Sequence, residues 1–119
     1  MPGEMIDVPA KGATMYKARL TVQVKAGRFK EYLGKTEKMN DLARSRGWTE
    51  ATYLIPTVGT ANQIIAEFEY PDLASFEREG DASFADPEMM AIVKDAVDCL
   101  VDGSIRSELL QTISTADMA

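Results

Sequence analysis

The residues best suited to chemistry are polar side chains at alternate positions in segments that we expect to be strands. Alternation puts every second side chain of a strand on one face of a sheet, so these polar groups are expected to meet there. They are Arg19, Thr21, Gln23, Gln63, Glu67, Arg106 and Glu108. Such a set can line a pocket for a small, partly polar organic molecule, with Arg19 or Arg106 pairing with its carboxylate, enolate or carbonyl. The same set can instead form ion pairs across strands, such as Arg19 with Glu108, that only hold two subunits together.

Glu67 is the first candidate for a general base in this set. A carboxylate that is withdrawn from water holds a proton more tightly and can take one from a substrate near neutral pH. Two nearby arginines would oppose this effect. The role of Glu67 as a base therefore requires both arginines to be engaged elsewhere.

Three aromatic side chains, those of Tyr32, Trp48 and Tyr53, are candidates for stacking on an aromatic ligand. Tyr53 is the preferred catalytic candidate, because its hydroxyl group can donate a hydrogen bond to a developing oxyanion. It alternates with Thr52 and Leu54, but alternation does not decide which set faces a site. Packing in a core or an interface is the other interpretation of these side chains.

The composition excludes several kinds of site. The chain contains no histidine, so by itself it cannot build a Ser-His-Asp triad, a His-ligated zinc site or a proximal-His haem site. Its single cysteine, Cys99, excludes an intrachain Cys-rich metal site and an internal disulfide bond. A crowd of carboxylates, those of Glu77, Glu79, Asp81 and Asp86, lacks calcium-loop spacing and fits a solvated acidic surface. We therefore expect no cofactor and no metal ion.

Charge and hydropathy indicate the partners and the compartment. The net charge of -6 repels nucleic acid phosphates and anionic lipids, and no apolar run is long enough to span a membrane, so we expect neither partner. The first fifteen residues lack the basic start and apolar core of a secretion signal. With its lone cysteine, the chain is expected in the cytoplasm.

The periodicity of apolar residues predicts an α+β domain. In order, the expected elements are strand 16–25, helix 28–46, strand 48–57, strand 62–70, a helix from 73 to about 79 that is interrupted at Gly80 and Asp81, a helix from 87 to about 100, and strand 104–113. This is the ferredoxin-like βαββαβ order, with a four-stranded antiparallel sheet and the helices on one face. We expect a loose extension at residues 1–14, the domain at 15–113 and a tail at 114–119.

Several short segments resemble the NIPSNAP-type family within the dimeric α+β barrel superfamily. They are residues 59–65 (GTANQII), 70–73 (YPDL) with Phe76, 85–88 (ADPE) and 103–110 (GSIRSELL). The resemblance covers most of residues 15–113 and implies a homodimer in which two sheets close into a barrel with the helices outside. The superfamily includes cofactor-free quinone-forming monooxygenases, haem-degrading monooxygenases, muconolactone isomerases and proteins without an assigned reaction. NIPSNAP-like members mostly belong to the last group, so no catalytic motif carries over, and the missing histidine departs from relatives that use one.

Two functions follow as expectations. In the first, the barrel binds a small aromatic or polyketide-like molecule, as in a cofactor-independent monooxygenase, isomerase or cyclase, with Glu67 and Tyr53 catalytic. The residues expected to bind the substrate are Arg19, Gln23, Trp48, Arg106 and Glu108. In the second, the protein is a non-catalytic dimeric accessory or stress protein whose barrel is a packed interface. An open or filled barrel interior distinguishes the two.

Overall fold

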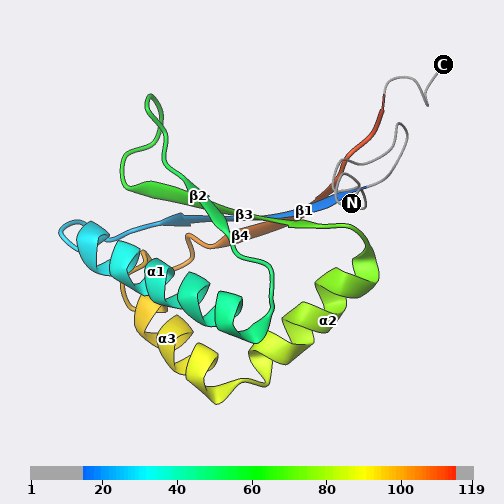
Figure 1. The fold of residues 1–119 in the computed structure, drawn as a ribbon. Coiled ribbons are helices and arrows are strands. Elements are labelled where there is room, and N and C mark those ends of the chain that lie inside the picture. Colours follow the sequence, from blue (N-terminus) through cyan, green and yellow to red (C-terminus); the bar gives the residue numbers. More distant parts are fainter. Residues whose placement is uncertain (1–14, 115–119) are drawn as a thin grey trace.

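The computed structural model describes residues 15–114, so the extension expected at residues 1–14 and tail residues 115–119 lie outside the described residues. The elements are β1 (Tyr16–Gln23), α1 (Phe29–Arg46), β2 (Thr52–Leu54), β3 (Gln63–Tyr70), α2 (Leu73–Phe84), α3 (Pro87–Val97) and β4 (Arg106–Gln111). The four strands form one antiparallel sheet in the order β2-β3-β1-β4, and the helices cover one of its faces (Figure 1). The ferredoxin-like βαββαβ prediction is confirmed.

β1 lies in the middle of the sheet and separates two kinds of surface. Its apolar side chains face the helices together with those of β3, and Val22 and Ile64, which are register partners, are 2% and 1% exposed. Val24 and Leu100 extend this core beyond the strand ends. The alternate side chains of β1 lie on the opposite face, which no element within residues 15–114 covers (Figure 1). We call this second surface the outer face.

The helix break expected at Gly80 and Asp81 is wrong, because α2 runs without interruption from Leu73 to Phe84. Asp72 caps the helix as expected, and its Oδ1 accepts a hydrogen bond from the Ser75 amide at 2.7 Å. A glycine inside a helix costs roughly 1 kcal/mol relative to alanine, which a capped and packed helix tolerates. α3 also begins as expected at Pro87, and the Asp86 carboxylate accepts hydrogen bonds from the backbone amides of Glu88 and Met89.

β2 is shorter than the strand predicted over residues 48–57. At Ala51, just before β2, the side chain of Asn40 makes the hydrogen bonds that a neighbouring strand would make. Its Nδ2 donates to the Ala51 carbonyl at 2.9 Å, and its Oδ1 accepts from the Ala51 amide at 2.8 Å. Pro56 follows two residues after β2 and cannot donate to a ladder. The expected strand is therefore shortened before β2 by bonds to a side chain and after β2 by a proline.

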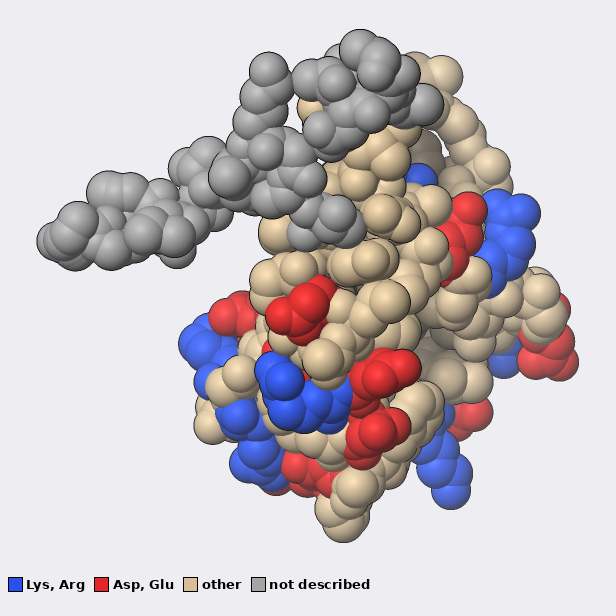
Figure 2. Space-filling view, turned by 90° about the vertical axis from the view of Figure 1, so that its right-hand side faces the viewer, with Lys and Arg blue, Asp and Glu red and all other residues tan. Residues whose placement is uncertain are grey.

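None of the helices described within residues 15–114 combines the length and the apolar character needed to cross a bilayer. On the face shown in Figure 2, acidic and basic side chains of the described residues are interspersed. The described residues on this face form no continuous basic patch of the kind that binds nucleic acid phosphates.

Two adjacent isoleucines test the assignment of the faces. Ile64 is 1% exposed in the core, so Ile64→Ala is expected to lower the free energy of unfolding by about 2–5 kcal/mol. Ile65 lies on the outer face and is only half-buried, so Ile65→Ala removes the same atoms at well under half that cost. Urea unfolding at low protein concentration measures both. Equal losses at the two positions would contradict the assignment.

Candidate functional site

The sheet divides the residues predicted from the sequence into two groups. Tyr53 pairs with Ala66 in the β2–β3 register, so its side chain lies on the helix side of the sheet, as does that of Trp48. The other predicted residues lie in strands at positions that face the opposite way; they are Arg19, Gln23, Glu67, Arg106 and Glu108. The single site that was expected is therefore not assembled within one chain.

Ion pairs occupy the centre of the outer face. Arg19 Nε lies 2.8 Å from Glu67 Oε2, and Lys17 Nζ lies 3.6 Å from Glu67 Oε1. Although Glu108 also opposes Arg19 in the register, the arginine pairs with Glu67 and not with Glu108. The condition stated above for Glu67 to act as a base, that the arginines be engaged elsewhere, is thus not met by Arg19. The arrangement is typical of a structural surface.

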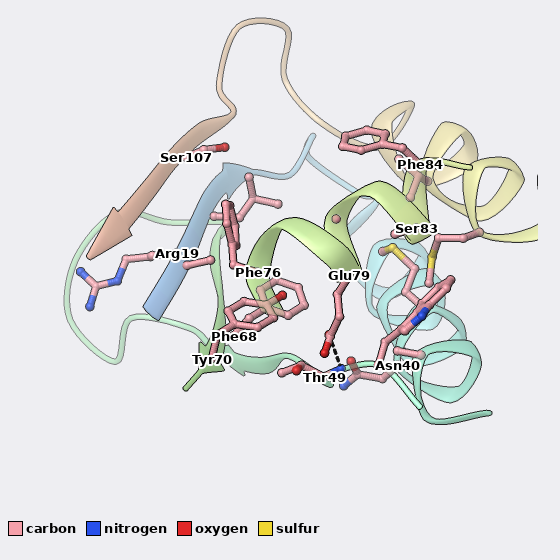
Figure 3. Close-up of a pocket in the computed structure, with 18 of the residues that line it drawn as sticks. Arg19, Asn40, Thr49, Phe68, Tyr70, Phe76, Glu79, Ser83, Phe84 and Ser107 are labelled. Carbon is pink, nitrogen blue, oxygen red and sulfur yellow. Dashed lines mark hydrogen bonds between the residues drawn. The ribbon is translucent and has the colours of Figure 1, made fainter. Parts of the chain in front are cut away.

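A pocket of about 710 Å³ lies on the helix side, between the sheet and the three helices (Figure 3). The apolar face of β1 passes from the core, at Val22, to the wall of this pocket, at Ala18 and Leu20. The wall is rich in aromatic and methionine side chains: Trp48, Tyr53, Phe68, Tyr70, Phe76, Phe84, Met39, Met89 and Met90. Such a surface suits an apolar, ring-containing molecule.

The tilt of α2 opens this pocket. α2 runs from the end of β3 away from the sheet, and α3 returns towards it, so the two helices form a V below the strands (Figure 1). Phe76 holds the upper end of α2 to Tyr70 with an edge-on ring contact, centroid to centroid 5.6 Å. Gly80 lines the pocket, and a Cβ atom there would meet nothing within 4 Å. Small residues on this side of α2 leave the space unfilled.

Arg46 and Gly47, at the end of α1, fix the position of the pocket wall that contains Trp48 and the start of α3. Arg46 Nε lies 2.8 Å from Asp86 Oδ2, which joins the end of α1 to the start of α3. Its guanidinium, with the backbone amide of Met89, lowers the pKa of Asp86. Gly47 takes a left-handed conformation with φ of 77°, after which the Trp48 amide donates to the Ala43 carbonyl at 2.8 Å. The indole thereby reaches the pocket.

Few polar groups face the pocket. Glu79 Oε1 accepts a hydrogen bond from the Thr49 amide at 2.7 Å, which ties α2 to the segment after α1 (Figure 3). Burial raises the pKa of Tyr70, and the negative charge of Glu79 raises it further. Burial also raises the pKa of Tyr53, with a smaller effect from Tyr32. Both tyrosines are therefore neutral hydrogen-bonding groups at neutral pH.

Glu79 is the site residue that reasoning from sequence missed. It was assigned to a solvated acidic surface, yet the structure places it half-buried in the pocket wall. Phe76, Gly80 and Ser83 follow one another at spacings of four and three, which continues a helical stripe across the expected break. Extending the helix through Gly80 would have put Glu79 beside that stripe.

No protein-family model matches the chain, and no curated protein matches it. Solved structures do share its fold. A NIPSNAP family protein of unknown function from Agrobacterium tumefaciens superposes with a TM-score of 0.71 at 17% identity, covering 89% of this chain and 94% of its own. An uncharacterized NIPSNAP domain protein from Burkholderia xenovorans gives 0.66 at 21% identity, covering 81% and 91%.

A putative antibiotic biosynthesis monooxygenase from Nitrosomonas europaea has the same fold, with a TM-score of 0.66 at 9% identity over 88% of this chain and 95% of its own. The expected likeness to NIPSNAP proteins is thus confirmed at the level of the fold. At these identities the likeness concerns the fold alone, and the chemistry must be argued from the side chains of this chain.

Proposed function

We propose that this protein is a homodimer that binds a small, largely apolar aromatic molecule in the helix-side pocket of each subunit. The observation that carries the proposal is the pocket of about 710 Å³ with its aromatic and methionine wall. Sites for small organic molecules usually measure about 300–1,000 Å³ and combine an apolar lining with a few polar groups. Glu79, Tyr70 and Tyr53 supply such groups here.

The proposed ligand lies on the helix side of the sheet and not in the barrel interior, which is where the sequence-based expectation puts it. The outer face carries the Arg19–Glu67 ion pair together with apolar side chains such as Leu54 and Ile65. These features support a packed interface there. The two functions expected from the sequence therefore apply to different faces: a structural interface outside, and a ligand site beneath the helices.

The partner that we propose for the outer face is a second copy of this chain. Although the chain carries a net charge of -6, the strand residues of this face include equal numbers of cations and anions. They are Lys17, Arg19 and Arg106 with Glu67, Glu69 and Glu108. Two such faces can meet without net repulsion. The loop after β2 rises on the same side of the sheet, with Ile55 60% and Val58 94% exposed, and can contact the partner (Figure 1).

We further propose that any reaction of this protein takes place in the helix-side pocket. Cofactor-independent monooxygenation, isomerisation and cyclisation of an enolisable compound each benefit from a carboxylate base in a site that excludes water. Glu79 offers that carboxylate beside the aromatic wall, whereas Glu67 pairs with two cations on the outer face. The proposed compartment is the cytoplasm, since the only cysteine, Cys99, is free and fully buried.

Filling the pocket tests ligand binding. Trp48 is the only tryptophan and lies in the wall, so a bound neutral fluorophore such as N-phenyl-1-naphthylamine is expected to quench its emission. In Gly80→Phe the new ring projects from a helical position where a Cβ atom meets nothing within 4 Å. The variant is therefore expected to fold and to bind at least about tenfold more weakly.

Gly34→Phe is the matched control, because Gly34 is an exposed helical glycine of α1 whose Cβ atom would also meet nothing within 4 Å. It is expected to bind the fluorophore as the unmodified protein does. Binding that Gly80→Phe leaves unchanged would contradict the pocket. Thermal unfolding of both variants verifies that each is folded.

Self-association is tested by placing a charge on the outer face. Ile65→Asp adds a third anion beside the Glu67 and Glu69 carboxylates of β3, and is expected to convert a dimer into a monomer in sedimentation equilibrium. Leu33→Asp changes an exposed position of α1, 40% exposed on the helix layer, and is expected to leave the dimer intact. A monomer before any substitution, or loss of the dimer in both variants, would contradict the proposed interface.

A further inference from the structure

Within residues 15–114, a single side chain brings charge into the helix-side pocket. Three lining residues are of charged type, namely Arg19, Glu79 and Glu108. Arg19 and Glu108 touch the pocket through their strands, but their side chains belong to the outer face, where Arg19 Nε lies 2.8 Å from Glu67 Oε2. Figure 3 shows the guanidinium group pointing away from the aromatic wall. The local charge is therefore that of the Glu79 carboxylate.

The Glu79 carboxylate is held in place through one of its two oxygen atoms, and the other oxygen accepts no hydrogen bond from residues 15–114. Oε1 accepts the Thr49 amide at 2.7 Å, which fixes the side chain against the wall. Among residues 15–114, no lysine or arginine forms a salt bridge with it, and its Oε2 accepts no hydrogen bond from the protein. An anchored carboxylate with one free oxygen is a strong acceptor for a donor group on a ligand.

The other polar groups near Glu79 do not offset its charge. Both polar atoms of the Asn40 side chain are engaged with the Ala51 backbone. The Tyr70 hydroxyl is neutral, because burial raises its pKa and the negative charge of Glu79 adds a smaller rise. Among the described residues that line this part of the wall, none offers a positive charge to an anionic ligand.

We propose that the pocket selects aromatic ligands that carry a hydrogen-bond donor, as a hydroxyl group or an ammonium group, and rejects aromatic carboxylates. Glu79 Oε2 accepts the donor while the rings lie on the aromatic and methionine wall. A ligand carboxylate would meet a like charge in an apolar setting that screens it poorly. This inference rests on the proposed function, and it reverses the preference for anions that Arg19 and Arg106 suggested from the sequence.

Four naphthalene derivatives of similar size test the inference: naphthylmethanol, naphthylmethylammonium, naphthoate and the methyl ether of naphthylmethanol. Calorimetric titration at neutral pH is expected to give the tightest binding for the alcohol and the ammonium ion. The ether lacks a donor and naphthoate carries a negative charge, so each is expected to bind at least about tenfold more weakly.

Glu79→Gln removes the charge and keeps an oxygen for the Thr49 amide, so the variant is expected to fold. The ammonium ion is expected to lose its advantage in affinity in this variant. Naphthoate is expected to bind to the variant at least about tenfold more tightly than to the unmodified protein. Glu77→Gln is the control, because Glu77 is exposed on the same helix and does not line the pocket. It is expected to keep the original order.

The outcomes separate this inference from the proposed function. Binding of naphthoate as tight as that of the alcohol, or an order that Glu79→Gln leaves unchanged, would overturn the role of Glu79 while leaving the pocket intact. Failure of all four compounds to bind would overturn the proposed function, and this inference with it.

Discussion

The hydrogen-bonded position of β1 between β3 and β4 is the constraint on which the rest of the structure depends. A strand paired on both edges can turn its side chains only above and below the sheet. In β1 the side chains on the two faces differ in polarity without exception, since the apolar Leu20 and Val22 alternate with the polar Arg19 and Thr21. The helices cover the apolar face, which becomes the interior. The polar face is the one on which we propose the interface with a second copy, so the interior and the proposed interface both follow from one alternating pattern.

The interior is filled at one end and open at the other. Near Val22 and Ile64, the helices α1 and α3 pack closely on the sheet, and Cys99 is fully buried. Towards Leu20 and Tyr70, α2 leans away, and the same apolar face becomes the wall of a pocket. Core and site thus share one surface of the sheet. In this arrangement the sheet forms one wall of the pocket, and the tilt of α2 sets its shape.

Local patterns in the sequence predicted much of the fold. The alternation in β1 and β3 gave the faces, and Asp72 and Asp86-Pro87 gave the helix starts, because strand periodicity and helix capping act over a few residues. The length of β2 was not predictable, since it depends on Asn40, which reaches Ala51 from a different element.

The position of the candidate site depends on contacts between residues far apart in the sequence, so local patterns do not predict it. The side of the sheet that Tyr53 faces is set by its register with Ala66, which alternation within β2 does not fix. The pocket itself arises from the angle of α2, a property of packing among three helices. The pairing of Glu67 with Arg19 and the place of Glu79 in the pocket wall, on an α2 that continues past Gly80, both depend on contacts that no local pattern in the sequence reveals.

The central claim is that the sheet separates a ligand site beneath the helices from an interface on the outer face. Intermolecular NOEs between an unlabelled aromatic ligand such as naphthylmethanol and the methyl groups of the labelled protein test it most directly. The account predicts NOEs to Met39, Met89 and Leu20, which line the pocket. NOEs to Thr21, Ile65 and Leu110, on the outer face, would contradict it.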